Sequence, residues 1–378
     1  MLMKLSSLAA WLALSGGLAT GRDVPPSGTS TACTCNIGTI PVAVDVRIPS
    51  DPSLPINTTD TRRIHEIYDI FGVLCAPNED ASSGLSDRVQ LLLHGNTYTT
   101  AYWTFPYNGF RNYSYVAYSC ERGLSSFAFD MVGSGLSTRP SNSSDIQLFV
   151  ASNVTSSLSA MLKDGTVSRA LGGSGKRFSK VVAFGHSLGA VTLNWVAIAL
   201  GSRTPFDAFV PTGHIHDPGF IVIDPVQHVP AREVDPARWG NLDPGYITTP
   251  NISARATFYS TDTTTFSSQV LMIDELTKDL GSSAMAPALE GAVYVPATGF
   301  TGPVAIVVGE DDQVHCVSPG NDFLPCNITS VLAQERPFYS DSKNVTAFVV
   351  PKTGHDLDLQ FTTNETFQLF TDLVNELV

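Results

Sequence analysis

Short runs of apolar, mostly β-branched residues recur along the chain, and each ends in a Gly-rich or polar turn. Continuous apolar runs of this length are typical of strands that are buried on both faces of a sheet. Between some of these runs, apolar residues spaced three to four positions apart predict helices at 144–165 and 188–201. The predicted strands lie at 42–48, 89–95, 126–133, 180–187, 206–213, 304–312 and 346–355.

The alternation of strands and helices predicts an α/β fold, with a parallel sheet and crossover helices. The first two strands are an exception, because no helix separates 40–48 from 64–75, and we expect them to be antiparallel. The segment 214–302 breaks the rhythm and is rich in Pro, Asp and Thr. We expect it to be a cap insertion over one edge of the sheet, dividing the core into 35–213 and 303–378.

Composition excludes several classes of protein. Of the 378 residues, 43% are hydrophobic and 15% are charged, which excludes an intrinsically disordered chain. The 22 Lys and Arg residues against 35 Asp and Glu give a net charge of −13. A nucleic-acid partner is not expected, because such binding needs a basic footprint.

The N-terminus has the pattern of a secretory signal peptide. Lys4 precedes a short apolar stretch at 5–14, and small residues follow. We therefore expect a signal peptide at 1–21, a Pro/Gly/Ser-rich linker at 22–34 and an extracellular protein. No other apolar run approaches the ~20 residues that cross a bilayer, so no integral membrane span is expected.

Two further features agree with secretion. The six cysteines form an even set, which in an oxidising compartment indicates disulfides. Cys316 and Cys326 are our expected pair because they close a short loop, although the full connectivity stays open. The acceptor pattern for N-glycosylation occurs at Asn57, Asn112, Asn142, Asn153, Asn251, Asn327, Asn344 and Asn364.

The sharpest chemical signal is a nucleophile elbow. Gly185, His186, Ser187, Leu188 and Gly189 lie between a predicted strand and a predicted helix. A serine on such a tight strand-to-helix turn needs small residues two positions before and two positions after it. The helix that begins behind Ser187 also favours developing negative charge.

A serine hydroxyl needs an adjacent base, which in turn is oriented by a carboxylate. In this setting the expected chain order is serine, acid, histidine. Asp312 follows a predicted strand and is our choice for the acid, with Asp311 in reserve, and His355 follows the last strand. All three turns fall at the carboxyl edge of the predicted sheet, where open α/β sheets bind ligands.

An oxyanion hole needs two backbone N–H donors. We expect Leu188 to supply one, and Asn96, in the turn after an earlier strand, to supply the other. His94 in the same turn is more readily explained as structural.

The segments HGN, FDMVGSGLS, GHSLGA, GEDD and GHD, in this order, resemble the α/β-hydrolase superfamily. The stretch YWTFPYNGFRNYSYV followed by GLSSFAFDMVGSGLS is similar, more narrowly, to secreted fungal hydrolases of the AB-hydrolase-1 type. The resemblance implies an α/β-hydrolase fold with an eight-stranded, mostly parallel sheet, helices on both faces and a Ser187, Asp312 and His355 triad. It also implies a structural role for Asp130.

Two other residue groups allow more than one interpretation. His214, His216 and Asp217 superficially resemble metal ligands, but zinc sites need three or four suitably placed ligands, so we expect no metal. An aromatic cluster that includes Tyr98 and Trp103 follows the oxyanion turn, and either lines a substrate pocket or belongs to the core.

We therefore predict a secreted serine hydrolase that cleaves small carboxylic esters through an acyl-enzyme and needs no cofactor. An alternative is an enzyme of secondary metabolism with the same fold that forms lactones, transfers acyl groups or cleaves C–C bonds. A non-catalytic binding protein fits the intact triad less well. Acyl and alcohol specificity and the oligomeric state stay open.

Overall fold

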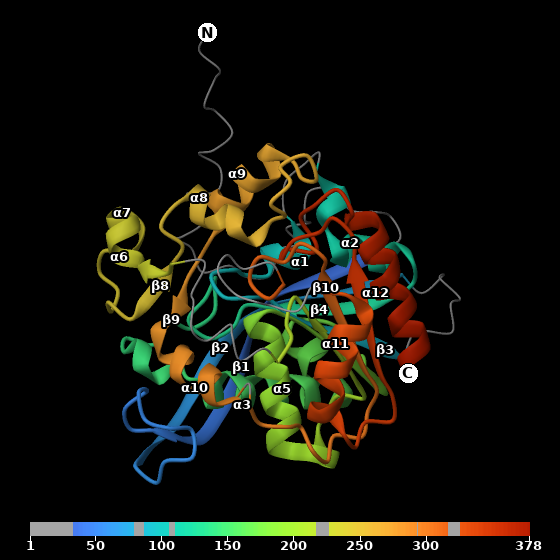
Figure 1. Ribbon diagram of the computed structural model, residues 1–378. Coiled ribbons are helices and arrows are strands. Elements are labelled where there is room, and N and C mark those ends of the chain that lie inside the picture. The colour runs from blue at the N-terminus through green and yellow to red at the C-terminus, as the bar shows by residue number, and fades with distance from the viewer. Residues whose placement is uncertain (1–32, 79–86, 106–109, 217–226, 293, 317–325) are drawn as a thin grey trace.

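The computed structural model describes residues 33–78, 87–105, 110–216, 227–292, 294–316 and 326–378. Eight strands form one sheet in the order β1-β2-β4-β3-β5-β6-β10-β11 (Figure 1). Their bounds are β1 (Cys33–Pro49), β2 (Thr61–Pro77), β3 (Arg88–Leu93), β4 (Ser125–Phe129), β5 (Lys180–His186), β6 (Ala208–Thr212), β10 (Val304–Gly309) and β11 (Val345–Val350).

The pairing confirms the mostly parallel sheet that the sequence predicts. β1 pairs antiparallel with β2, and β2 pairs antiparallel with β4. The pairs from β4 to β11 along the sheet order are parallel. β1 begins at Cys33, so its first two residues belong to the range 22–34 that we expected to be linker, which is a correction. The expected signal peptide, 1–21, lies outside the described residues.

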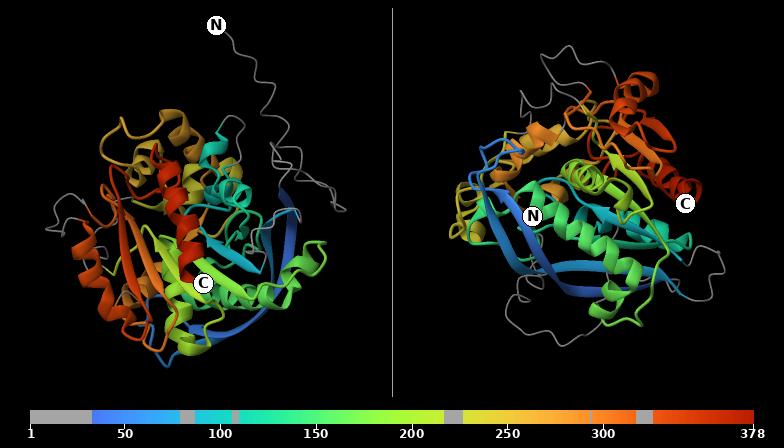
Figure 2. Two further views of the ribbon diagram at one scale, coloured as in Figure 1. Left: turned by 90° about the vertical axis from the view of Figure 1, so that its right-hand side faces the viewer. Right: turned by 90° about the horizontal axis from the view of Figure 1, so that it is seen from below.

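Helices cover both faces of the sheet (Figure 2). Side chains of a buried strand alternate between the two faces, and β3 shows this directly. Leu91 and Leu93 pack into one core and Leu92 into the other. The first core receives side chains of α3 (Leu148–Asp164), α5 (Leu188–Leu200) and α11 (Ile328–Glu335), and the second those of α1 (Ala101–Thr104), α2 (Tyr115–Glu121) and α12 (Thr363–Leu377). A further short helix, α4 (Thr166–Ala170), follows α3.

The segment between β6 and β10 carries secondary structure of its own and is called the cap below. Its strands β7, β8 and β9 form a second, three-stranded sheet. The helices α8 and α9 lie beyond the carboxyl ends of the parallel strands (Figure 1). The elements are β7 (Val229–Pro230), α6 (Ala231–Val234), α7 (Pro236–Trp239), β8 (Tyr246–Thr248), α8 (Ile252–Arg255), α9 (Ser268–Thr277), β9 (Gly281–Ser282) and α10 (Ala286–Ala292).

Three disulfides tie the described chain together. Cys35 and Cys75 are register partners on β1 and β2 and are bonded to each other. The other bonds join Cys33 to Cys120 and Cys316 to Cys326, the pair that we expected from the short loop.

The surface bears on two further expectations. Seven of the eight asparagines in acceptor patterns are exposed, whereas Asn153 is only partly exposed within α3. Glycosylation at these positions stays a prediction. Across the described ranges, no helix has both the length and the apolar character needed to cross a membrane.

Candidate active site

The turn after β5 holds Ser187 in an uncommon backbone conformation. Its φ is +52° and its ψ is −116°, and α5 begins at the next residue. A non-glycine residue with positive φ is strained and persists only where the surrounding structure holds it. Here the N–H of Ser187 donates to the carbonyl oxygen of Thr212 on β6, at 2.9 Å. The serine therefore occupies the sharp elbow that the sequence predicts.

The two glycines of the elbow lie where there is no space for a side chain. A Cβ on Gly185 would lie 2.6 Å from the backbone nitrogen of Ala190. A Cβ on Gly189 would lie 2.7 Å from the carbonyl oxygens of Leu93 and His94. Any side chain at either position would push α5 away from the sheet, so the glycines allow the close approach that shapes the elbow.

His355 and Asp312 form a buried hydrogen-bonded pair. The Nδ1 of His355 lies 2.9 Å from Oδ2 of Asp312, and both side chains are almost fully buried. The other carboxylate oxygen accepts from the N–H groups of Val314 and His315. Burial alone would raise the pKa of Asp312, but His355, His315 and the backbone donor of Val314 hold it below its usual value. Asp312 is therefore ionised and orients Nδ1–H of the imidazole.

The second acid of the doublet points elsewhere. Oδ2 of Asp311 accepts from Oγ of Ser260 in the cap, at 2.8 Å. Of the two adjacent acids, the structure brings Asp312 and not Asp311 to His355.

His355 lies beside the nucleophile elbow. Its ring centroid is 4.8 Å from that of His186, which immediately precedes Ser187. His186 itself stacks on Tyr102, with ring centroids 4.3 Å apart. Burial, together with the nearby His355, lowers the pKa of His186 well below its usual value, so this ring is neutral.

The turn after β3 closes against the elbow from the other side. A Cβ on Gly95 would lie 3.3 Å from Cβ of Ser187. His94 supports this turn, because Nδ1 lies 2.8 Å from the Gly95 carbonyl oxygen and Nε2 accepts from the N–H of Met131. Burial outweighs the Gly95 contact and lowers the pKa of His94 to about 4, which agrees with a structural, neutral histidine.

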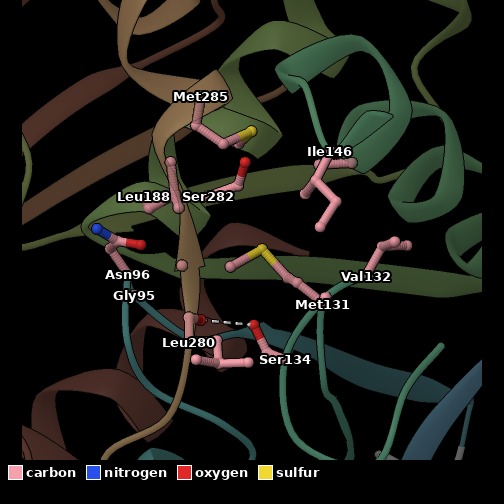
Figure 3. Close-up of a pocket in the computed structure, with 13 residues that line it drawn as sticks. Gly95, Asn96, Met131, Val132, Ser134, Ile146, Leu188, Leu280, Ser282 and Met285 are labelled. Atoms are coloured by element: carbon pink, nitrogen blue, oxygen red, sulfur yellow. Dashed lines mark hydrogen bonds between the residues drawn. The ribbon is translucent and has the colours of Figure 1, made fainter. Parts of the chain in front are cut away.

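A narrow pocket opens beside Gly95 (Figure 3). Both residues that we expect to supply oxyanion donors, Leu188 and Asn96, lie on its wall. The remaining lining is mostly apolar. It comprises Met131, Val132, Gly133, Ser134, Ile146, Ala151, Leu280, Gly281, Ser282 and Met285.

Neither aromatic residue that we considered for a substrate pocket is among the residues lining this pocket. Trp103 packs between Tyr115 and Phe370 and belongs to the core. The ring of Tyr98 is buried too, and its hydroxyl reaches the cap and the loop 351–362 between β11 and α12, which carries His355 and is called the histidine loop below.

Asp130 joins two loops of the core. Its carboxylate oxygens accept from the N–H groups of Thr100 and Leu136, at 2.7 and 2.9 Å. Burial, only partly offset by these donors, raises the pKa of Asp130 to about 6. These contacts agree with a structural role.

The histidines that superficially resembled metal ligands are engaged otherwise. Nδ1 of His216 lies 2.7 Å from Glu335, and Nε2 lies 3.0 Å from the amide of Asn194. The ring centroid of His214 is 5.4 Å from that of His216, and Asp217 lies outside the described residues. Within the ranges that the structure covers, no group of three or more His, Cys, Asp or Glu side chains is placed to hold a metal ion.

Sequence reasoning missed a set of buried polar residues linked to the loop that carries His355. Arg255 and Asp274 come from the cap, and Asp356 follows His355 directly. Only the burial of charged residues in a cap marks them as unusual, and burial is not visible in the sequence. The acid that follows the predicted catalytic histidine was the one available hint.

A comparison with family models finds the alpha/beta hydrolase family over residues 90–366. The chain belongs to this family. A search of the curated proteins finds no match. The narrower resemblance to secreted fungal enzymes stays a prediction.

Solved structures of this family are similar in fold. An esterase from Thermogutta terrifontis is 14% identical, with 89% of this chain and 99% of that chain covered and a TM-score of 0.51. A lipase in an open form is 14% identical, with 82% and 95% covered and a TM-score of 0.50. A variant of potato epoxide hydrolase is 14% identical, with 89% and 99% covered and a TM-score of 0.48. At these identities the comparisons show the fold alone.

Proposed function

We propose that the protein is a secreted serine hydrolase that cleaves small carboxylic esters through an acyl-enzyme. The observation that carries this proposal is the strained elbow at Ser187, with a buried His355–Asp312 pair beside it. A strained serine next to an oriented imidazole is the arrangement that nucleophilic acyl transfer requires.

In the proposed reaction, Oγ of Ser187 attacks the ester carbonyl while Nε2 of His355 takes its proton. The ionised Asp312 holds Nδ1–H and stabilises the imidazolium that forms. The N–H groups of Leu188 and Asn96 stabilise the oxyanion. His355 then protonates the leaving alcohol, and water, activated by the same imidazole, releases the acid.

The pocket in Figure 3 supports a site for the acyl group. Gly95 forms part of its wall and approaches Ser187 closely, so an acyl chain in the pocket would extend from the attacked carbonyl. Met131, Ile146 and Met285 make that space apolar and narrow. We therefore expect short acyl groups to be preferred.

A serine at the elbow also bears on the epoxide hydrolase neighbour. Epoxide hydrolases of the α/β-hydrolase superfamily use an aspartate as the nucleophile, whereas this chain has Ser187 at that position. Ester cleavage is therefore the better-supported reaction.

The test uses p-nitrophenyl esters of graded acyl length and a fluorophosphonate probe. Wild type should hydrolyse short esters and become labelled at Ser187, and Ser187→Ala should lose both properties while keeping its thermal stability. Full turnover by Ser187→Ala would overturn the proposal. Product analysis that shows a lactone or a transferred acyl group in place of the free acid would move the reaction to the alternative class.

Export is tested separately by sequencing the N-terminus of the secreted protein. Cleavage near residue 21 and a mass decrease after glycosidase treatment would support secretion and glycosylation.

A further inference from the structure

One segment of the cap, residues 255–265, is bonded directly to the loops that carry Asp312 and His355, and we call it the strap. The N–H of Asp356 donates to the carbonyl oxygen of Phe258, at 2.7 Å. Oε1 of Gln360 accepts from the N–H groups of both Ser260 and Gly354, at 3.2 and 2.9 Å. The strap is thus in direct contact with the histidine loop.

The loop that follows β10, residues 310–316, carries Asp312 and is called the acid loop; it is bonded to the same segment. The side chain of Gln313 donates to the carbonyl oxygen of Tyr259, at 2.8 Å, and Oγ of Ser260 donates to Asp311. A Cβ on Gly354 would lie only 2.3 Å from the carbonyl carbon of Tyr259. The backbone of the strap therefore packs directly against the backbone of the histidine loop, with no space for a side chain at position 354.

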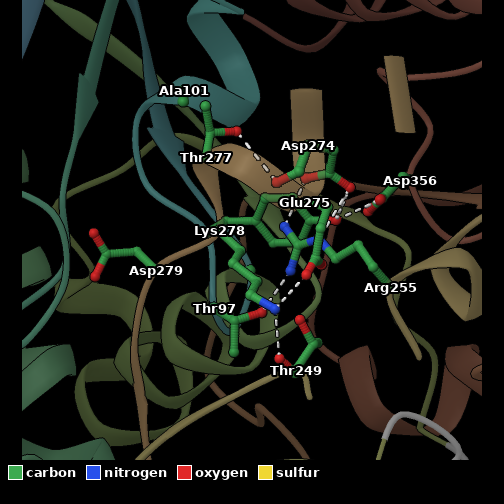
Figure 4. A network of polar contacts seen from close by, with 12 residues as sticks. Thr97, Ala101, Thr249, Arg255, Asp274, Glu275, Thr277, Lys278, Asp279 and Asp356 are labelled. Carbon is green, nitrogen blue, oxygen red and sulfur yellow. Dashed lines mark hydrogen bonds and ion pairs between the residues drawn. The ribbon is translucent and has the colours of Figure 1, made fainter. Parts of the chain in front are cut away.

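A buried ion pair holds the strap in place (Figure 4). Nε and Nη2 of Arg255 donate to the two carboxylate oxygens of Asp274 on α9, at 3.0 and 2.7 Å. Nη1 of Arg255 donates to Oγ1 of Thr97, in the turn after β3. The guanidinium also lies 3.7 Å from the ring centroid of Tyr98. Arg255 is therefore fixed by the cap and the core at once.

Tyr98 connects the Arg255–Asp274 pair to the histidine loop. Its hydroxyl contacts Oδ2 of Asp274 at 3.3 Å and also contacts Oδ2 of Asp356. Oδ1 of Asp356 lies 3.4 Å from Nε2 of His186 in the elbow. Burial and the neighbouring Asp274 raise the pKa of Asp356 well above its usual value, so this carboxyl keeps its proton. With that proton, each of the two contacts of the Tyr98 hydroxyl has a hydrogen available.

We infer that Arg255 and Asp274 are positioning residues: they hold Tyr98 and, through its hydroxyl, Asp356, and so fix His355 toward Asp312. This inference rests on the proposed function, because it concerns the same triad. It makes the strap, together with α8 and α9, a part of the catalytic apparatus, and this part of the cap cannot lift away as a lid without separating the acid and histidine loops.

The test compares two buried tyrosines, Tyr98 and Tyr246. Tyr98→Phe keeps the ring and removes the hydroxyl, and we expect kcat to fall about 10-fold, since a displacement of 1 Å at a catalytic group costs up to ~100-fold. KM should change by less than about 2-fold, because the acyl pocket is untouched. Tyr246→Phe is the matched control, since its hydroxyl donates to the Pro140 carbonyl, away from the triad, and both constants should stay near wild type.

A second pair of variants tests the contact at Asp356. Asp356→Asn can make the same two contacts as the protonated acid and should keep most of the activity, whereas Asp356→Leu should lose about as much kcat as Tyr98→Phe. Hydrogen exchange gives a readout besides activity. Amides of 353–361 should exchange faster in Tyr98→Phe, and those of α5 should not.

The outcomes separate the two proposals. If Ser187→Ala is inactive but Tyr98→Phe behaves like Tyr246→Phe in kcat and in exchange, the positioning inference is wrong and the proposed function stands. If wild type neither turns over esters nor reacts with the fluorophosphonate probe, both proposals are wrong. A loss in Asp356→Asn as large as that in Asp356→Leu would also contradict the inference.

Discussion

The two halves of the cap make different kinds of contact near Ser187. The half that contains α8, the strap and α9 buries an ion pair and makes hydrogen bonds to the acid and histidine loops. The half around β9 contributes Leu280 and Met285, which line the pocket with apolar surface. One insertion thus makes directional contacts with the loops that carry Asp312 and His355, and non-directional contacts along the wall of the pocket.

This difference predicts that variants in the two halves will change different kinetic properties. Directional contacts hold groups at fixed positions, so changes in the strap half should appear in kcat. Apolar walls discriminate between ligands by size, at ~1–3 kcal/mol for each methylene, so changes in the pocket half should appear in the preference among acyl chains. Variants on each side can break or sharpen this comparison.

The largest effect is expected at the doubled acid. Asp312→Asn should lower kcat by about 10⁴-fold, because the imidazole then loses the carboxylate that selects its tautomer. Asp311→Asn should lower it by less than ~10-fold, because the Asp311 carboxylate accepts from Ser260 of the strap and not from His355. Steady-state kinetics with one short ester measures both, and equal losses would show that the two acids share one role.

The ion pair of the strap half should dominate stability. Asp274→Leu leaves Arg255 buried without its partner, and we expect it to lower the free energy of unfolding by about 3–5 kcal/mol. The double variant Arg255→Met/Asp274→Leu should regain most of that loss, since no unpaired charge is left. Urea unfolding of the three proteins decides this, and a double variant as unstable as the single one would contradict the expected cause.

The pocket half should change selectivity and not the chemistry. Met285→Ala widens the pocket, and we expect the ratio of kcat/KM for octanoate over acetate esters to rise about 10-fold. Met272→Ala on α9 is the control, because that methionine is exposed and does not line the pocket. An unchanged ratio in Met285→Ala would show that this pocket does not bind the acyl group.

The smallest effect is a pH dependence in the histidine loop. Burial raises the pKa of Asp358 well above its usual value, and neither carboxyl oxygen has a hydrogen-bond partner within the described residues. With the folded-state pKa above the unfolded one, the contribution of Asp358 to stability is complete below about pH 4 and is lost as pH rises through the folded-state pKa.

Asp358→Asn should therefore gain stability relative to wild type as pH rises, by at most about 1.4 kcal/mol per pH unit. Thermal unfolding at several pH values checks this. The exposed Asp262, whose pKa is lowered by its contacts with Thr264, is the control, and Asp262→Asn should show no such gain. A difference between Asp358→Asn and wild type that does not vary with pH would show that Asp358 is ionised throughout.

The sequence alone was sufficient to predict a mostly parallel sheet with an antiparallel first pair, and the strand-turn-helix pattern around Ser187. The signals for Ser187, Gly185 and Gly189 lie within a few residues of one another, between a strand and a helix. Such local patterns survive in any tertiary context, because steric space at the turn and alternation along the strand decide them. The elements of the cap could not be predicted from the sequence, since helices of four residues such as α6, α7 and α8 show no periodicity.

Only the tertiary structure decided which of two adjacent acids meets His355, and what holds it there. Successive residues in a turn point to different neighbours, so Asp311 and Asp312 differ in role although they are side by side in the chain. Tyr98 and Asp356 are 258 positions apart and meet through a hydroxyl. Such a contact depends on burial and on the docking of the cap, and no local pattern in the sequence encodes it.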